Sequence, residues 1–360
     1  DSPYPGLPYN AWSNAAHTIQ TAIDASAPGD TVVAAAGVYD SGGTVVYGNM
    51  TNRVAVTKAI TLRSANGPAS TIIRGQGPLG NAAIRCVYLT NGATLVGFTL
   101  TNGYTTLSGS VWEEESGGGV WGEGGSAVSN CIITGCAAFH GGGAYGRTNL
   151  WLVDCTLVGN SAWGGYAWSG GGAYSCFMSN CVVTGNRANW GGGTAGVVLY
   201  NCTVSSNTAG GYGGGVLTGM AIDSTIVGNK NFGWGGGGLY ESRAQNCLIR
   251  GNYSTNGGGV YWSYITNCVI ESNSATYGGG TYNGVVERCI LRGNVASNSG
   301  GGLYDGTIRG CLVVGNSARE GGGGTYFLNG GSLENCTVAG NSSDYAGGIC
   351  YGSADNCVIY

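Results

Sequence analysis

The sequence contains little charge. Only 9% of its 360 residues are Asp, Glu, Lys or Arg, and the formal net charge is −4. Lys58 and Lys230 are the only lysines. Binding of nucleic acid or anionic lipid requires clustered basic side chains, because these neutralise phosphate groups. We therefore expect neither class of partner.

Long apolar runs and metal-binding motifs are also lacking. No run of 18 apolar residues occurs, so no membrane span is expected, and the opening "DSPYPGLPYN" does not resemble a secretion signal. We expect a mature, processed or trimmed chain. His17 and His140 are the only histidines and no C-x-x-C pair occurs, which argues against zinc. No G-K-[ST] follows the glycine runs, so they are not phosphate loops. We expect no metal and no cofactor.

Glycine is abundant and occurs in a repeated pattern. The chain has 73 glycines, yet 42% of it is hydrophobic, which is too much apolar material for a disordered linker. Blocks such as "NCVVTGN" recur every 21 to 26 residues, and blocks of the form G-G-G-x-Tyr stand between them. The anchor residues of the first block are Cys131, Cys155, Cys181, Cys202, Ser224, Cys247, Cys268, Cys289, Cys311, Cys336 and Cys357.

A period of this length without a helical pattern is typical of one coil of a parallel β-helix, whose coils stack about 4.8 Å apart. Leucine-rich repeats need several leucines per unit, and propeller blades need about 40 residues. We predict an all-β solenoid with a cap over residues 1–53 and coils over 54–360, regular from about residue 98. A short helix in the cap is predicted from the spacing of Ala15, Ile19, Ala22 and Ile23.

Alternation along each strand predicts which side chains point inward. The anchor residue, a cysteine in every unit except that of Ser224, and the apolar residue two positions later share the core face. Arg250, Glu271 and Arg292 in successive coils are expected to form an outward ladder of opposite charges. A rank of asparagines, including Asn252 and Asn273, is interpreted as structural, because an amide can donate to one neighbour and accept from the other.

The fourteen cysteines fall into two groups. Ten occupy the anchor rank, where we expect small, buried, reduced thiols, because parallel Cβ vectors suit disulfide geometry poorly. Four lie off this rank and are the better disulfide candidates: Cys86, Cys136, Cys176 and Cys350.

Aromatic residues flank the glycine block on both sides. The residue that follows it is expected to point outward, and a looser rank precedes it. Two interpretations stand: the stacked rings only stabilise the solenoid, or a side-chain-free glycine trench between them accepts a sugar chain or another subunit. The candidate binding residues are Trp190, Tyr212, Trp234, Tyr240, Tyr261, Tyr282, Tyr304 and Tyr326.

The chain stops inside a strand, at "NCVIY". An uncapped last coil would leave Ile359 and Tyr360 and the strand edges open, and open edges template further pairing. Either the natural chain continues or another copy docks there, in which case end-to-end assembly produces a filament.

The stretch "HTIQTAIDASAPGDTVVAAAGVYD" resembles the opening of secreted right-handed parallel β-helix proteins, including polysaccharide lyases. The repeats "GNSA…GGGGTY" and "GNRANWGGGTAG" resemble those of polymorphic outer membrane proteins and autotransporter adhesins. These resemblances imply a right-handed parallel β-helix in an extracellular or cell-surface setting.

Two functions follow from the sequence. The first is a non-catalytic structural or adhesive β-solenoid whose partners are copies of itself or extracellular glycans; it has no catalytic residues. The alternative is a polysaccharide-binding or polysaccharide-processing, lyase-like β-helix. Its site would lie near the acidic residues Glu113, Glu114, Glu115 and Glu123 and the early arginines.

Overall fold

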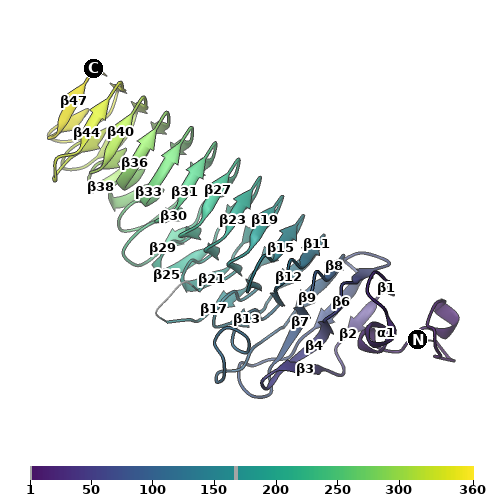
Figure 1. Ribbon diagram of the computed structural model, residues 1–360. Helices are drawn as coiled ribbons and strands as arrows, with labels where there is room; N and C mark the ends of the chain where they lie inside the picture. Colours follow the sequence, from purple (N-terminus) through teal and green to yellow (C-terminus); the bar gives the residue numbers. More distant parts are fainter. Residues whose placement is uncertain (1, 166–168) are drawn as a thin grey trace. The chain divides into compact units, whose positions relative to one another are not determined.

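The computed structural model describes residues 2–165 and 169–360 (Figure 1). The chain forms two compact units: residues 1–164 with 171–181, here the N-terminal unit, and residues 165–170 with 182–360, the C-terminal unit. Each is built of parallel β-solenoid coils, and one α-helix lies near the N-terminus. The predicted fold class is confirmed. The expected boundary at residue 53 lies inside strand β4 (Met50–Val56).

The N-terminal unit begins with a 3-10 helix, Trp12–Asn14, and helix α1, Ile19–Ala25. Its remaining strands are β1 (Thr31–Ala34), β2 (Gly37–Tyr39), β3 (Thr44–Tyr47), β5 (Thr61–Ser64), β6 (Thr71–Arg74), β7 (Ile84–Leu89), β8 (Thr94–Val96), β9 (Thr99–Thr101), β10 (Val120–Gly122), β11 (Ala127–Ser129), β12 (Ile132–Thr134), β13 (Ala137–Ala138), β14 (Ala144–Gly146), β15 (Trp151–Val153), β16 (Thr156–Val158), β17 (Ser161–Ala162), β18 (Ala173–Tyr174) and β19 (Phe177–Ser179).

The C-terminal unit contains β20 (Val182–Thr184), β21 (Arg187–Trp190), β22 (Thr194–Ala195), β23 (Val198–Tyr200), β24 (Thr203–Ser205), β25 (Thr208–Tyr212), β26 (Val216–Leu217), β27 (Met220–Ile222), β28 (Thr225–Val227), β29 (Lys230–Asn231), β30 (Leu239–Tyr240), β31 (Arg243–Gln245), β32 (Leu248–Arg250), β33 (Val260–Thr266), β34 (Val269–Glu271) and β35 (Ser274–Tyr277). It continues with β36 (Thr281–Glu287), β37 (Ile290–Arg292), β38 (Val295–Ser299), β39 (Leu303–Tyr304), β40 (Thr307–Arg309), β41 (Leu312–Val314), β42 (Ser317–Ala318), β43 (Thr325–Tyr326), β44 (Ser332–Glu334), β45 (Thr337–Ala339), β46 (Ile349–Cys350), β47 (Ser353–Asp355) and β48 (Val358–Ile359).

Helix α1 is the predicted capping helix. The hydroxyl of Thr18 accepts the N–H of Thr21 at its start, and Ile19 and Ile23 are buried. At its end the Lys58 ammonium donates to the carbonyl oxygens of Ile23, Asp24 and Ser26, at 2.7–2.9 Å. A cation beside the last carbonyls of a helix is stabilising.

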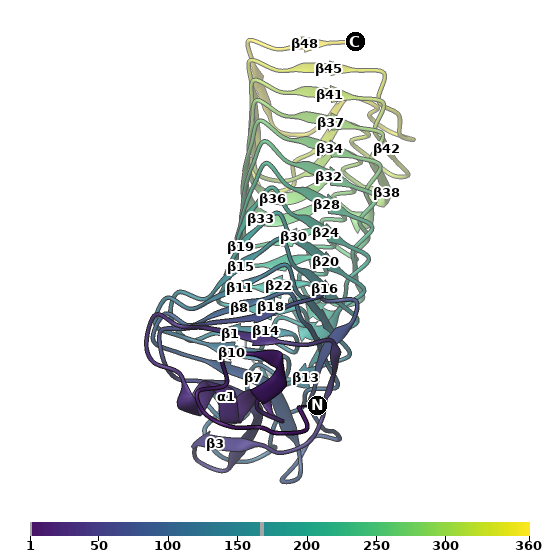
Figure 2. The same ribbon diagram turned by 90° about the vertical axis from the view of Figure 1, so that its right-hand side faces the viewer.

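Equivalent residues of successive coils pair in parallel register within the C-terminal unit. Ile249, Ile270 and Leu291 are direct partners in β32, β34 and β37. Figure 2 shows β24, β28, β32, β34, β37 and β41 one above another. The coils turn at residues with positive φ, such as Asn267 (φ 53) just before the anchor Cys268. Asn adopts this left-handed conformation more readily than most residues, which explains the recurring Asn-Cys pair.

The core follows the predicted alternation. The anchor cysteines and the apolar residues two positions later are buried, except that Cys357 and Ile359 are partly or largely exposed. The asparagine rank is also interior: Asn252, Asn273 and Asn294 have no exposed surface. Outside, Glu271 contacts Arg250 at 3.6 Å and Arg292 at 2.6 Å, which confirms the charge ladder.

All fourteen cysteines are free thiols. The expectation of reduced anchor cysteines is confirmed, whereas the disulfides suggested for Cys86, Cys136, Cys176 and Cys350 do not form. Three of these sulfurs point to backbone carbonyls instead, Cys86 to Thr101 and Cys136 to Thr134 at 3.2 and 3.4 Å, and Cys176 to Tyr174 at 3.1 Å.

No described helix is long and apolar enough to cross a membrane.

Candidate functional site

The predicted tyrosine rank forms a continuous stack in the C-terminal unit. Neighbouring ring centroids lie 4.9–5.2 Å apart, with interplanar angles of 5–20°. The stack consists of Tyr240, Tyr261, Tyr282, Tyr304 and Tyr326. Parallel pairing of β30, β33, β36, β39 and β43 puts these side chains in register. Because each inner ring has a neighbour on both faces, only ring edges and hydroxyls remain for a partner.

Burial also affects the chemistry of these phenols. Tyr304 is 8% exposed and the other four are half-buried. Burial raises the pKa of Tyr304 to about 12, and it raises the pKa of Tyr261 and Tyr282 as well. The hydroxyls therefore stay protonated at neutral pH. They can donate and accept hydrogen bonds but are poorly suited to act as bases.

Only some residues of the looser aromatic rank contact this stack. Trp190 contacts Tyr212 edge-on at 4.7 Å, and Tyr212 contacts Tyr240 at the same centroid distance. Trp234 is 72% exposed. The ring contacts found among the described residues do not include it.

The glycine block is not an open trench. Gly257, Gly258 and Gly259 are buried, like their equivalents in neighbouring coils. A Cβ added to Gly259 would lie 2.6 Å from the carbonyl oxygen of Gly280 and 2.9 Å from the side-chain nitrogen of Asn273. The glycines are thus required because coils stack too closely for a side chain. The hypothesis that a bare glycine strip faces the partner is wrong.

A row of residues just after the tyrosines was not singled out by sequence analysis. Trp262, Asn283 and Asp305 follow Tyr261, Tyr282 and Tyr304, and all three have positive φ, at 47°, 52° and 53°. Strand register makes them equivalent positions of three successive coils. The three residues are of different types, so no repeat in the sequence marks them. The one signal that could have identified them is their position at a turn of the coil, directly after an outward-pointing tyrosine.

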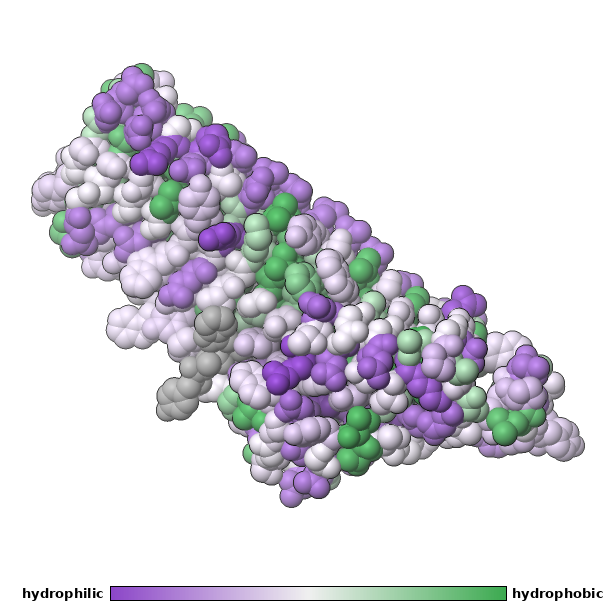
Figure 3. Space-filling view, viewed as in Figure 1, coloured by the Kyte–Doolittle hydropathy of each residue, from purple (hydrophilic) through white to green (hydrophobic). Residues whose placement is uncertain are grey.

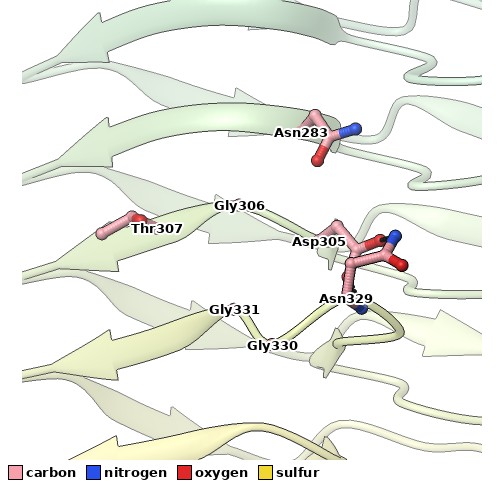
Figure 4. Close-up of a pocket in the computed structure, with 7 residues that line it drawn as sticks. All are labelled: Asn283, Asp305, Gly306, Thr307, Asn329, Gly330 and Gly331. Carbon is pink, nitrogen blue, oxygen red and sulfur yellow. Dashed lines mark hydrogen bonds between the residues drawn. The ribbon is translucent and has the colours of Figure 1, made fainter.

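Two members of this row line a polar cavity of about 190 Å³ (Figure 4). Its lining residues are Asn283, Asp305, Gly306, Thr307, Asn329, Gly330 and Gly331. The Asp305 carboxylate is 2% exposed. It accepts the N–H groups of Leu328 and Asn329 at 2.6 and 3.1 Å, and the Asn329 side-chain amide at 2.9 Å. This fixes the loop after β43 against the cavity.

Trp262 lies one coil from Asn283 and two from Asp305. Its side chain is 53% exposed, and its ring meets that of Tyr261 at 5.5 Å, tilted by 30°. Tyr264, 42% exposed, donates its hydroxyl to Glu287 at 2.7 Å. Unlike the stacked tyrosines, Trp262 keeps a large part of its surface available.

The acidic cluster of the N-terminal unit is largely structural. Glu114 accepts the N–H groups of Asn49 and Ser110 at 2.7 and 2.8 Å, and Glu113 lies 3.4 Å from Arg147. Arg85 is fully buried and donates to Asn52 and to three backbone carbonyls. Burial lowers the pKa of Arg85 to about 9. Among the described residues, no group of three or more His, Cys, Asp and Glu side chains could hold a metal ion.

The predicted assembly residues are accessible. Ile359 is 49% exposed and Tyr360 is 81% exposed. Self-assembly through them stays a prediction.

No protein-family model and no curated protein matches this sequence. Among solved structures, the A-module of the Azotobacter vinelandii mannuronan C-5 epimerase AlgE6 is 16% identical with a TM-score of 0.46, covering 95% of this chain and 94% of that one. The alginate lyase AlyF-OU02 is 12% identical with a TM-score of 0.38, covering 90% and 82%. The catalytic domain of a GH87 alpha-1,3-glucanase is 13% identical with a TM-score of 0.39, covering 95% and 64%. Likenesses of this size assign no activity to the present chain.

Proposed function

We propose that this protein is a secreted, non-catalytic polysaccharide-binding β-solenoid. Its binding site is formed by Trp262 and the adjoining cavity of Asn283, Asp305 and Asn329. The observation that carries this proposal is the register of an exposed indole with a half-buried amide, Asn283, and a buried carboxylate, Asp305, in the next two coils.

The chemistry of this row suits a sugar chain. A sugar ring presents an apolar face that packs on an aromatic ring and hydroxyls that need hydrogen-bond partners. Trp262 offers the first contact, while Asn283 and Thr307 at the cavity offer the second. Two coil spacings cover roughly 10 Å, which suits a short stretch of oligosaccharide. Parallel pairing of the strands that carry the stacked tyrosines holds this row in register.

The cavity is arranged for binding rather than for hydrolysis. Glycoside hydrolysis ordinarily uses two carboxyl groups on opposite sides of the bond. Asp305 is the single acidic residue lining this cavity, and its oxygens already accept three N–H groups. With no basic residue in the lining, the site favours an uncharged polysaccharide.

The surface is compatible with a hydrated partner. On the face shown in Figure 3, hydrophobic residues form small groups separated by polar ones. An extended apolar patch, as protein–protein interfaces often have, would look different.

Affinity electrophoresis in gels containing neutral and acidic polysaccharides tests the proposal. We expect retardation by at least one neutral polysaccharide, and we expect Trp262→Ala to weaken it at least tenfold. Trp234→Ala is the matched control, because Trp234 is more exposed than Trp262 but precedes the glycine block of its coil and does not line the cavity. Loss of binding in Trp234→Ala alone would favour the glycine-flanking rank and contradict this site.

The enzymatic alternative needs a separate assay. Incubation with acidic polysaccharides, followed by ultraviolet absorbance, detects the unsaturated product of a lyase. Its appearance would overturn a non-catalytic function.

A further inference from the structure

The N-terminal unit contains a second cavity, larger than the first, of about 470 Å³. It lies between residues 17–20 at the start of α1, the segment 35–43 that includes β2, and residues 53–54 of β4. This volume is in the range of small-molecule sites. Its polar lining residues are His17, Thr18, Gln20, Tyr39, Ser41 and Arg53. An added Cβ at Gly37 or Gly42 would meet no atom within 4 Å, so the space is open at both positions.

Arg53 is the unusual member of this lining. It is 6% exposed, yet no carboxylate of the described residues lies within 4 Å of it. Its Nε donates to the carbonyl oxygen of Arg74 at 2.8 Å, and Nη1 donates to that of Gly42. A guanidinium carries five N–H groups, so three donors of Arg53 remain available for a ligand. A buried cation without a counter-ion is costly, which makes this side chain a candidate ligand group.

Asp40, the acidic residue whose charge acts on Arg53, does not neutralise it. The Asp40 carboxylate pairs with Arg74 at 3.4 Å, and both side chains are about half exposed. Burial lowers the pKa of Arg53, and the charge of Asp40 offsets this only in part. A carboxylate entering the cavity could pair with the fork of the guanidinium, the geometry in which Arg binds carboxylates most strongly.

The other lining groups suit hydroxyls. The Tyr39 hydroxyl donates to the carbonyl oxygen of Ala35 at 2.9 Å, so its oxygen can still accept. His17 Nε2 lies 2.8 Å from the carbonyl oxygen of Ser2, to which it donates, and Nδ1 is left for a ligand. Ser41 is exposed at the rim.

We propose that this cavity binds a sugar acid, with the uronic carboxylate on Arg53 and the ring hydroxyls toward Tyr39, His17 and Ser41. This site is built from other residues than the polysaccharide site proposed above and does not depend on it. Its ligand is charged, whereas the lining of the first site favours an uncharged one.

Isothermal titration calorimetry on the full chain tests the proposal with D-glucuronate, D-glucose and acetate. We expect glucuronate to bind at least tenfold more tightly than glucose, which lacks the carboxylate, and than acetate, which lacks the ring. Absence of glucuronate binding overturns the proposal. Equal binding of acetate and glucuronate overturns its sugar part.

Two variants locate the site. Arg53→Met should weaken glucuronate at least tenfold, whereas Arg63→Met, at an exposed arginine outside the cavity, should leave it unchanged. Should Arg53→Met fail to fold, Ala36→Phe provides the decision, because Ala36 is exposed at the lining and a phenyl ring there fills the space. Unchanged glucuronate binding in Ala36→Phe would place the ligand elsewhere and contradict this site.

Discussion

Asn252 and Asn273 occupy the same buried position in successive coils, and the side-chain nitrogen of Asn252 donates to the amide oxygen of Asn273 at 3.0 Å. That oxygen also accepts the backbone N–H of Asn252 at 2.9 Å. The Asn273 nitrogen donates in turn to Asn294 and to the carbonyl oxygen of Ile249, both at 3.0 Å. One amide therefore takes part in four hydrogen bonds without contact with solvent.

Asn273→Ala should lower the free energy of unfolding by about 3 kcal/mol, because each buried group left without a partner costs about 1–3 kcal/mol. Asn189→Ala is the control: Asn189 is exposed and donates to the carbonyl oxygen of Gly165 at 3.3 Å. It should change stability by about 0.5 kcal/mol or less. Urea denaturation followed by circular dichroism measures both. Equal effects would show that the interior ladder contributes no more than a surface amide.

The asparagine ladder and the anchor cysteines were predictable because the same residue type recurs at the same position in most of the repeats. Strand register makes Phe98 the equivalent of Cys131 one coil earlier; Phe98 is fully buried, and its N–H lies 3.3 Å from the sulfur of Cys131. Alternation along a strand then fixes which neighbours point inward.

The binding row could not be predicted in the same way. Trp262, Asn283 and Asp305 differ from one another, so no repeat marks them, and the cavity depends on a loop around Asn329 held by hydrogen bonds to Asp305. The burial of Gly259 was missed for another reason. The sequence shows that residue 259 has no side chain, but it does not show that the carbonyl group of Gly280 in the next coil occupies the place where a side chain would lie.

Gly259→Ala tests that explanation of the glycine block. The added methyl group would clash with a backbone carbonyl, so we expect a loss of about 3 kcal/mol or more, or failure to fold. Gly251→Ala is the matched control, because its Cβ would meet nothing within 4 Å although φ is 61°. It should cost about 1–2 kcal/mol for the backbone conformation alone. Thermal unfolding compares the two. A well-tolerated alanine at residue 259 would contradict the close stacking of coils.

The tyrosine stack yields a prediction that separates stability from binding. Tyr282 lies between Tyr261 and Tyr304, at 5.0 and 4.9 Å. Tyr282→Ala should cost about 2–3 kcal/mol, since it removes two ring contacts and buried area. Tyr282→Phe keeps the stack and should cost less than about 1 kcal/mol. Polysaccharide retention by Tyr282→Phe should equal that of the parent chain. A large loss of retention with normal stability would make this hydroxyl a ligand contact.

Thiol labelling checks the cysteine ranks. Burial raises the pKa of Cys131 to about 11 and also raises that of Cys176, so their thiolates are scarce at neutral pH. With Ellman's reagent, we expect at most two thiols to react in the native chain, Cys350 and Cys357, which are only partly buried, and all fourteen in denaturant without reductant. Fewer than fourteen reactive thiols in denaturant would reveal disulfides that the structure lacks.

The last prediction concerns pH and Glu115, which is 6% exposed. Burial, with a smaller contribution from the charge of Glu114, raises the pKa of Glu115. The folded chain thus binds this proton more tightly than the unfolded chain, in which a glutamate titrates near about 4.3. The contribution of this group to stability is greatest in acid and falls as pH rises through the raised pKa.

Glu115→Gln removes the free-energy cost of ionising this buried carboxyl group. We expect its Tm to exceed that of the parent by about 1–3 °C at pH 7 and to match it below about pH 4. Glu320→Gln, at an exposed carboxylate, should leave Tm unchanged at both pH values. A lower Tm for Glu115→Gln at pH 7 would mean that the ionised carboxylate is stabilised where it lies, contrary to the direction of the shift.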